Sequence, residues 1–240
     1  MERELPLFEP SIILCIAAHP DDLEFGTSGS VAKWVAEGAV VHYLVCTDGS
    51  KGSDDPNLTS GELIKLRHVE QQAAADILGV TSVTFLDHED GLTEANTALK
   101  RDITAVIRRL KPDTVVMQDP LFMYSAEFGM INHNDHRKVA ESAMDAVYPL
   151  ARDHLSFPEL MGQGLEPHKV KEILMMSFEK ATFYVDISTT FETKMKALAA
   201  HESQVDIETV RPWLEPTSKS LGKLAGYDRA EGFIRLSMRL

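Results

Sequence analysis

The sequence predicts an α/β fold, a three-layer sandwich whose central sheet is mostly parallel. Short apolar runs rich in β-branched residues alternate with segments of helical periodicity along most of the chain. Such a strand–helix–strand order implies parallel strands joined by crossover helices, which cover both faces of the sheet. The length of 240 residues fits one large α/β unit. We therefore expect a single domain over residues 1–240.

The composition is that of an ordinary globular protein with an acidic balance. Hydrophobic residues make up 44% of the chain, charged residues 25%, and the formal net charge is −13. This charge argues against nucleic-acid binding and against an anionic membrane surface, which both require clustered Lys and Arg. No segment approaches the ~20 apolar residues of a transmembrane helix, and the first residues do not resemble a signal peptide. We expect a cytoplasmic protein whose partners include neither nucleic acid nor membrane.

The first elements form a strand–helix–strand unit. Residues 12–18 are an unbroken apolar run, typical of a buried parallel strand. Residues 31–36 have helical character, and residues 40–46 form the next strand. Cys15 and Cys46 lie inside these two strands, so we expect buried, unpaired thiols rather than a disulfide.

The next unit begins with a local signal. Thr59 and Glu62 have the spacing of a capping box. The helix that they introduce should run to about Leu78, before Gly79. Residues 83–86 then form the third strand.

The second half of the chain continues the alternation. A helical stripe of apolar residues precedes the fourth strand, which we place at residues 114–117; the stripe consists of Leu99, Ile103, Val106, Ile107 and Leu110. A helix from about residue 135 to residue 150 comes next. Residues 173–176 and 183–185 are candidate strands, and residues 191–201 should be helical. Residues 153–170, with two prolines and two glycines, are expected to form a surface excursion.

Polar residues follow the first strand without a break. His19, Pro20, Asp21 and Asp22 would lie at the carboxyl edge of the sheet, where open α/β folds bind ligands. A core strand has no packing use for an imidazole and two carboxylates. His19 and Asp22 are three residues apart, so a tight turn can direct both at one ion, with Asp21 free to act as a general base.

A second polar cluster, at residues 133–136, can complete this site. His136 would give a His-Asp-His ligand set, which suits Zn²⁺ and leaves a coordination position for water. His133 could face a developing oxyanion or a leaving amine. Asp135 could orient an imidazole, and Asp48, in the turn after the second strand, could accept hydrogen bonds near the site.

Each cluster alone has a plainer interpretation, because adjacent aspartates in turns are common and an isolated H-x-x-H is a weak signal. Other site types do not fit. The glycines at 26 and 29 lack the G-x-G-x-x-G spacing of a dinucleotide loop, and the G-x-S-x-G of a nucleophile elbow is absent.

Residues 18–26 and 133–137 resemble the two signature motifs of the PIG-L / LmbE-like N-deacetylases. The resemblance covers nearly the whole chain and extends to shorter segments at Thr47–Gly49, Arg67 with Glu70, Leu86–Gly91, Lys196–Gln204 and Ala230–Phe233. It implies a Rossmann-like fold, zinc, and removal of the acetyl group from N-acetylglucosamine-type sugars. By position, it implies roles for seven residues: His19, Asp22 and His136 as zinc ligands, Asp21 as general base, His133 at the oxyanion or leaving nitrogen, and Arg67 and Asp90 at the substrate.

The sequence departs from the family pattern at two places. Asn134 stands where proline is usual, which removes a rigid turn residue without touching a ligand. Some members carry a polarising tyrosine two residues before the first histidine of H-x-x-H, and here that position is Ile131. Tyr124 is near in sequence. His201 belongs to the late motif, and its role stays open between structure and site.

We therefore expect a zinc-dependent hydrolase that releases acetate and a free amine from an N-acetylated amino sugar or conjugate. Fe²⁺ accepts similar ligands and remains an alternative metal. Two other functions remain open: a non-catalytic metal- or sugar-binding protein, and an amidohydrolase acting on a non-sugar N-acyl metabolite. The resemblance also implies a homo-oligomer, a trimer or a hexamer.

Overall fold

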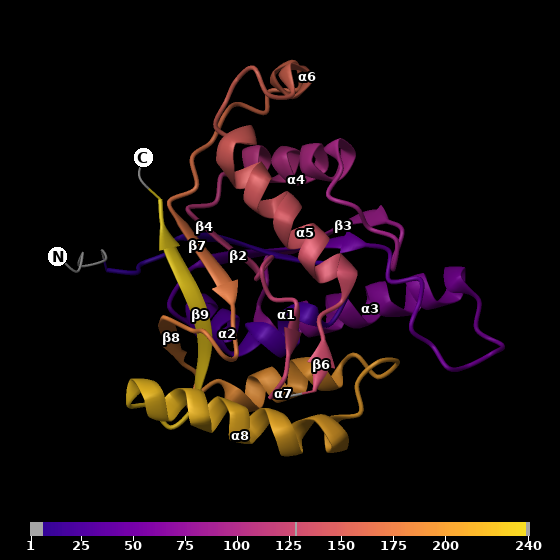
Figure 1. The fold of residues 1–240 in the computed structure, drawn as a ribbon, viewed down its shortest axis with the longest axis vertical. Helices are drawn as coiled ribbons and strands as arrows, with labels where there is room; N and C mark the ends of the chain where they lie inside the picture. The colour runs from indigo at the N-terminus through magenta and orange to yellow at the C-terminus, as the bar shows by residue number, and fades with distance from the viewer. Residues whose placement is uncertain (1–6, 128, 239–240) are drawn as a thin grey trace.

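The computed structural model describes residues 7–127 and 129–238 (Figure 1). A seven-stranded sheet with the order β3-β2-β1-β4-β7-β9-β8 runs through its centre. Five neighbouring strands are parallel, and β9 is antiparallel to both β7 and β8. The strands are β1 Ile12–Ala17, β2 Val40–Thr47, β3 Ser82–His88, β4 Thr114–Gln118, β7 Glu172–Met176, β8 Phe183–Asp186 and β9 Ala230–Ser237.

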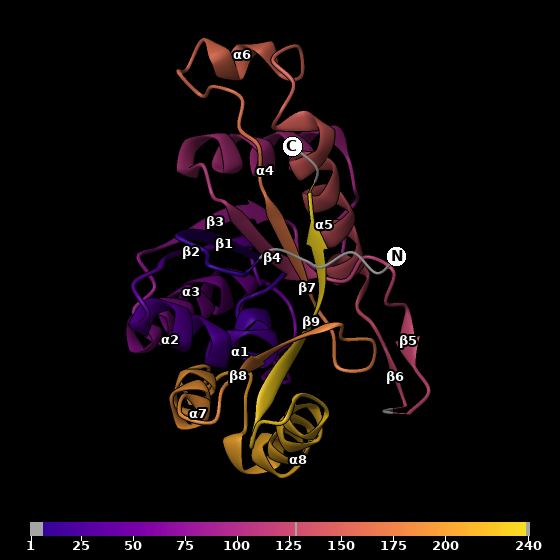
Figure 2. The ribbon, with the colours of Figure 1, turned by 90° about the vertical axis from the view of Figure 1, so that its left-hand side faces the viewer.

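Helices cover both faces of this sheet, which confirms the predicted three-layer α/β architecture. Figure 2 shows one group of helices below the sheet and another above it. The first group is α1 Asp22–Gly26, α2 Ser28–Ala36, α3 Ser60–Leu78, α7 Phe191–Ala199 and α8 Ile207–Ala225. The second group is α4 Thr97–Leu110, α5 Asn134–Asp145 and the π-helical turn η1 Ala146–Leu150.

Strand β1 is apolar throughout because it supplies both cores. Ile13 and Cys15 pack with the residues of α2, α3 and α7 on one face of the sheet. Leu14 and Ile16 pack with α4 and α5 on the other face. All four residues are fully buried. Because the side chains on both faces of the strand lie in a core, both faces are apolar.

The local signals that the sequence carries are in place. Thr59 and Glu62 form the predicted capping box at the start of α3, and Gly79 ends that helix with a φ of 75°. Both cysteines are buried and free.

Three of the longer elements differ from the sequence-based expectation. The helix expected over residues 135–150 is regular only to Asp145, because Tyr148 leaves helical geometry before Pro149. Helix α8 was not predicted, and it contains Pro212 and Pro216, residues that disfavour a helix interior. Strand β9 was not predicted as a strand either.

Two short segments project from the layers. Strands β5 Tyr124–Ser125 and β6 Met130–Ile131 form a hairpin between β4 and α5. Helix α6 Pro158–Met161 lies in the predicted excursion, at the top of Figure 1. No helix in the described part of the chain is long and apolar enough to span a membrane. The single domain over residues 1–240 stays a prediction.

The strand order places the two polar motifs together. The chain proceeds from β1 to β2 and β3 on one side, and then returns to β4 and β7 on the other. Ligands of such sheets bind where the order reverses, at the carboxyl ends of the two central strands. His19 follows β1 there, and α5 begins at Asn134 after β4 and the hairpin.

Candidate active site

Three predicted metal ligands converge at this edge of the sheet. His19 Nδ1 lies 3.2 Å from His136 Nε2. The Asp22 carboxylate approaches both imidazoles, with Oδ2 3.5 Å from His19 Nδ1 and Oδ1 3.0 Å from His136 Nε2. Donor atoms around a tetrahedral zinc ion are separated by roughly 3.3 Å, given bond lengths of about 2.0–2.2 Å. The spacing and the nitrogen–oxygen donor set therefore fit such an ion.

Hydrogen bonds on the far side of each imidazole leave the inward nitrogen free for a metal. His19 Nε2 lies 3.1 Å from Asp90 Oδ1 and 3.3 Å from Asp135 Oδ2. His136 Nδ1 lies 2.9 Å from Asn132 Oδ1. When these outer nitrogens donate, Nδ1 of His19 and Nε2 of His136 keep their lone pairs, as metal-binding histidines require.

The electrostatics of this centre favour a cation. Burial by itself would lower the pKa of His19, but hydrogen bonds to Asp135, Asp22 and Asp90 outweigh it and raise the pKa to about 12. Burial would raise the pKa of Asp22, yet His136 and His19 hold it well below its usual range. A divalent ion bound between these side chains would supply positive charge to the same carboxylates.

The structure brings further sets of possible ligands close to one another. The donor atoms of His19, His133 and His136 lie within 4.8 Å of one another, and so do those of His19, Asp90 and Asp135. Asp135 Oδ2 already accepts from the Gly91 amide at 2.6 Å, and Asp90 Oδ2 accepts from the Lys51 amide at 3.1 Å. These two carboxylates therefore support the outer side of His19 better than they could coordinate an ion.

Asp21 has an unusual backbone and an unusual acidity. Its φ of 89° places a non-glycine residue in the left-handed region, a strain that clusters at functional sites. Burial and the neighbouring Asp22 carboxylate raise its pKa to about 7, while Arg67, His201 and His19 oppose that rise. A carboxylate poised near neutral pH suits a general base.

Arg67 holds the loops around Asp21. It is only 4% exposed, and it donates to the carbonyls of Pro20 at 2.9 Å and of Gly49 and Lys51 at 3.2 Å. Its Nη2 lies 3.5 Å from Asp21 Oδ2. These contacts describe a positioning residue, and the contact of Arg67 with substrate stays a prediction.

Asp48 and Asp90 join the two loops that follow β2 and β3. Asp48 Oδ1 accepts from the amides of Ser50 at 3.0 Å and of Asp90 at 3.2 Å. Asp90 is 4% exposed and bonded to His19. Asp90 is thereby placed behind a predicted metal ligand, and its contact with substrate also stays a prediction.

A fully buried polar chain beneath Asp21 was not foreseen from the sequence. The Asp21 amide donates to Gln71 Oε1 at 3.1 Å, and Gln71 Nε2 donates to Glu24 Oε1 at 3.1 Å. Glu24 Oε2 lies 3.2 Å from His201 Nε2. Glu24, Gln71 and His201 have no exposed surface. Glu24 belongs to the first signature motif and His201 to the late motif, whereas Gln71 carried no signal. The structure places His201 in this chain and not among the predicted metal ligands.

The position of the absent tyrosine lies on the hairpin. Ile131 is 83% exposed, and it is the cross-strand partner of Tyr124. Tyr124 is also exposed, so neither side chain is enclosed by the described residues of the site. Asn134 donates through Nδ2 to the Thr93 carbonyl at 3.0 Å and so keeps a structural role where proline is usual.

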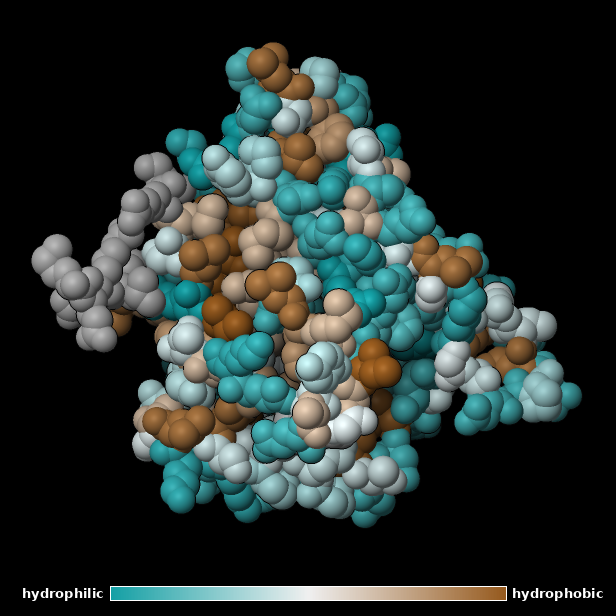
Figure 3. All heavy atoms as spheres, viewed as in Figure 1, coloured by the Kyte–Doolittle hydropathy of each residue, from teal (hydrophilic) through white to brown (hydrophobic). Residues whose placement is uncertain are grey.

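A cavity of about 560 Å³ opens beside Asp22 and His136. Its walls combine apolar and polar side chains from α1, β4, β6, β7 and α8. In Figure 3, apolar residues gather over the β7 and β6 region within a largely hydrophilic face. The lining comprises Phe25, Gly26, Gln118, Asp119, Phe122, Met130, Asn132, Met176, Ser177, Phe178, Glu179, Lys180, Trp213 and Thr217.

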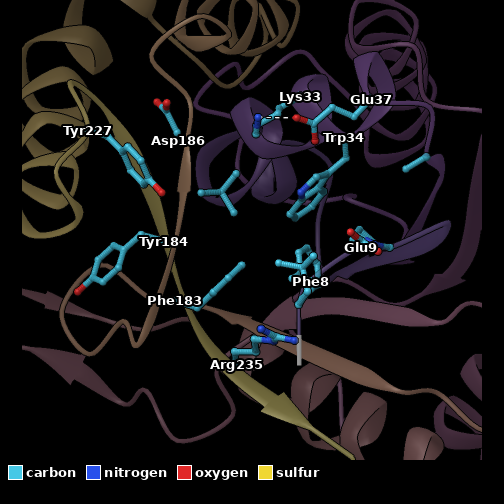
Figure 4. Close-up of a pocket in the computed structure, with 14 residues that line it drawn as sticks. Phe8, Glu9, Lys33, Trp34, Glu37, Phe183, Tyr184, Asp186, Tyr227 and Arg235 are labelled. Carbon is cyan, nitrogen blue, oxygen red and sulfur yellow. Dashed lines mark hydrogen bonds and ion pairs between the residues drawn. The ribbon is translucent and has the colours of Figure 1, made fainter. Parts of the chain in front are cut away.

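A second hollow, of about 850 Å³, contains none of the predicted site residues. Figure 4 shows Phe8, Trp34 and Phe183 around it. Its basic side chains are already paired, Lys33 with Glu37 and Arg235 with Glu172. Of these two hollows, the first is the one lined by predicted site residues, Asp22 and His136.

The chain is similar to known deacetylases. Residues 14–147 match the family described as PIG-L: GlcNAc-PI de-N-acetylase. Diacetylchitobiose deacetylase of Thermococcus kodakarensis is 33% identical over 95% of this chain and 84% of that protein. A 1D-myo-inositol 2-acetamido-2-deoxy-alpha-D-glucopyranoside deacetylase of Rhodococcus erythropolis is 26% identical over 81% of each.

Solved structures share the fold. N,N'-diacetylchitobiose deacetylase from Pyrococcus horikoshii, complexed with its inhibitor MPG, superposes with a TM-score of 0.88 and 29% identity, over 95% of this chain and 85% of that chain. GalB, the 4-carboxy-2-hydroxymuconate hydratase of Pseudomonas putida, has a TM-score of 0.80 at 19% identity, over 96% of this chain and 98% of that chain. The second likeness concerns the fold alone, because a shared fold does not imply a shared reaction.

Proposed function

The chain belongs to the PIG-L family, and from that premise we propose that it is a metal-dependent N-deacetylase of an N-acetylglucosamine-type amino sugar or conjugate. The products are acetate and a free amine. One observation carries the proposal: the donor atoms of His19, Asp22 and His136 converge beside Asp21 at the wall of a cavity.

Zinc is the metal that we propose, held by His19, Asp22 and His136, with Fe²⁺ as the alternative. Bound there, zinc would lower the pKa of a water molecule to about 7 and polarise the amide carbonyl.

Asp21 takes the proton from the attacking water. Burial and the adjacent Asp22 carboxylate raise the pKa of Asp21 above its ordinary value, which makes its carboxylate a better proton acceptor. Attack forms the new C–O bond on the acetyl carbon. As the C–N bond breaks, the proton passes from Asp21 to the nitrogen, so the sugar leaves as a free amine.

His133 faces the oxygen on which negative charge develops. Its Nδ1 accepts from the Asp135 amide at 3.2 Å, so the proton of the neutral ring resides on Nε2. Burial and the nearby His19 lower the pKa of His133, which keeps the ring neutral at neutral pH. A fixed N–H donor of this kind stabilises an oxyanion.

The test is acetate release by the zinc-loaded protein from a panel of N-acetylated compounds. The panel contains N-acetylglucosamine, N,N'-diacetylchitobiose, an N-acetylglucosaminyl inositol and several non-sugar N-acyl amines. Release from the sugars alone supports the proposal. Release from the non-sugar amides alone would replace it with a general amidohydrolase, and binding without release would indicate a non-catalytic sugar-binding protein.

We also propose a homo-oligomer, a trimer or hexamer, in the cytoplasm. The exposed apolar side chains of the segment around the β5–β6 hairpin support an assembly surface: Leu121, Met123, Tyr124 and Ile131. Light scattering on the purified protein gives the mass directly, and a monomer at micromolar concentration would contradict the assembly.

A further inference from the structure

The cavity beside Asp22 and His136 has mainly apolar walls that the methyl group of an acetyl substrate would leave uncovered. Its volume of about 560 Å³ lies in the range of pockets that enclose a whole small molecule. Apolar surface left in water forfeits hydrophobic free energy, which a hydrocarbon ligand restores. The apolar wall is made by Phe25, Phe122, Met176, Phe178 and Trp213.

This apolar wall begins at a predicted metal ligand and continues outward. Phe25 follows Asp22 by three residues in α1. The ring of Phe25 lies nearly parallel to the indole of Trp213 in α8, with centroids 6.0 Å apart and an angle of 11° between the planes. A flexible apolar chain attached to the reacting carbonyl could therefore lie along one continuous surface.

The polar side chains of the lining offer little to a sugar ring. Three of them already form hydrogen bonds with backbone groups, Asn132 at 2.7 Å, Asp119 at 2.9 Å and Thr217 at 2.7 Å. Glu179 and Lys180 are exposed, so they can stay hydrated when the cavity fills. A buried hydroxyl group without a partner costs free energy, so a hydrocarbon chain matches this cavity better than a second sugar does.

The cavity and the polar loops lie on opposite sides of His19. In the sheet, β4 and β7 lie on one side of β1, and β2 and β3 lie on the other. The cavity residues Met176 and Phe178 come from the end of β7 and the loop after it. Lys51 and Glu89, which pair at 3.2 Å and are exposed, come from the loops after β2 and β3.

A secondary amide carries its two substituents at opposite ends, the acyl chain on the carbonyl carbon and the sugar on the nitrogen. With the carbonyl at the predicted metal ligands, one substituent lies toward the β2 and β3 loops and the other toward the cavity. The hydroxyl groups of the sugar match the polar loops, and an acyl chain matches the apolar cavity.

We infer that the cavity receives the acyl group, and that the enzyme hydrolyses amino sugars whose N-acyl chain is apolar and longer than acetyl. The new C–O bond forms at the acyl carbon, the C–N bond breaks, and the proton from water passes to the nitrogen. The products are the carboxylic acid of the chain and the free amino sugar. This inference rests on the proposed function for the chemistry and adds a class of substrate.

Two kinds of substrate test where the chain binds. Amine release by the zinc-loaded protein is measured with N-acetyl-, N-butanoyl- and N-hexanoylglucosamine. Along this series, kcat/KM should rise by about 2- to 4-fold for each methylene that the cavity buries. Hexyl N-acetyl-β-glucosaminide carries the same chain on the anomeric oxygen. A flat or falling N-acyl series overturns the inference, and so does a gain confined to the hexyl glycoside.

A variant of the cavity wall links the preference to this surface. Phe178 is 38% exposed, so Phe178→Ser should leave the fold intact. The ratio of kcat/KM for the N-hexanoyl to the N-acetyl substrate should fall by roughly 3- to 10-fold, because apolar contact is lost. Leu155→Ser makes a similar change at an exposed residue outside the lining and should keep the ratio. An unchanged ratio in Phe178→Ser, or an equal fall in both variants, overturns the inference.

A binding measurement separates this inference from the proposed reaction. The zinc-loaded Asp21→Asn variant is titrated with N-hexanoylglucosamine, and tryptophan emission is recorded. A saturable change that is absent with N-acetylglucosamine, and that disappears when Trp213→Phe is added, supports the acyl cavity. The other tryptophan, Trp34, is 3% exposed in the core. No change, or a change that does not depend on Trp213, overturns the inference. If the wild-type protein releases amine from none of these substrates, the proposed reaction fails, whereas a Trp213-dependent change would leave the acyl cavity standing.

Discussion

The outer nitrogen of His19 lies 3.3 Å from Asp135 Oδ2, although the two residues are 116 positions apart in the sequence. Asp135 also accepts from the backbone amides of Gly91 at 2.6 Å and of Thr93 at 3.3 Å. The carboxylate is therefore fixed before it meets the imidazole. It sets the orientation and the tautomer of His19 and presents Nδ1 to His136 and Asp22.

Replacing Asp135 with Asn should weaken zinc binding by about 10- to 100-fold, the usual cost of losing the partner of a metal-binding histidine. The amide oxygen can still accept from Gly91, so the fold should persist. Competition with a chromogenic chelator measures the affinity. Asp76→Asn, on the exposed side of α3, is the matched control, and equal affinities for the two variants would show that Asp135 does not orient His19.

Replacing Asp21 with Asn should lower kcat by about 10²–10⁴, the range of general acid–base catalysis. An amide cannot take the proton of the attacking water. Metal analysis should still find one zinc ion per chain, because Asp21 is not among the three proposed ligands. Full activity in this variant would remove Asp21 from the mechanism.

Replacing Gln71 with Leu should reduce both stability and turnover. The change leaves the Asp21 amide and the Oε1 atom of Glu24 without their hydrogen-bond partner, at a cost of about 1–3 kcal/mol in the free energy of unfolding. The left-handed turn at Asp21 also loses an anchor, so kcat should fall more than KM rises.

The adjacent Gln72 is exposed and bonded only to Asp76 in the described contacts. Gln72→Leu is therefore a control with the same change in chemistry on the same helix. Urea unfolding and steady-state kinetics on both variants show whether the buried chain supports turnover as well as stability. A loss of stability at Gln71 with unchanged kcat would limit the buried chain to a structural role.

Replacing Lys194 with Met should destabilise the protein by about 3–5 kcal/mol, because it leaves the buried carboxylate of Glu231 without its cation. Lys194 Nζ lies 2.6 Å from Glu231 Oε1. Glu231 in turn accepts from the amides of Gly29 and Ser30 at the start of α2. Lys196→Met, on the exposed side of the same helix, should change the unfolding midpoint in urea only slightly, and comparable losses in the two variants would contradict the assigned cost.

The fold could be predicted wherever the deciding signal is local. The capping box of Thr59 and Glu62 involves residues three apart, and the structure contains it. The apolar run of β1 indicated a strand buried on both faces, and its alternate residues do supply both cores. Helix α8 was missed because Pro212 and Pro216 oppose a helix locally, and packing against β9 and α7 compensates only in the folded protein.

The sequence by itself determined the β-α order, the two polar motifs and the donor types for a metal, because each depends on residues close in the chain. The tertiary structure decided which side chains contact and orient the residues of these motifs. Asp135 meets His19, Gln71 meets Asp21, and Trp213 meets Phe25 only because the strand order brings distant loops and helices to one edge of the sheet. Residues that meet in this way are far apart in the sequence and show no periodic spacing. Their contacts therefore depend on how the helices and loops pack, and they cannot be read from a sequence pattern.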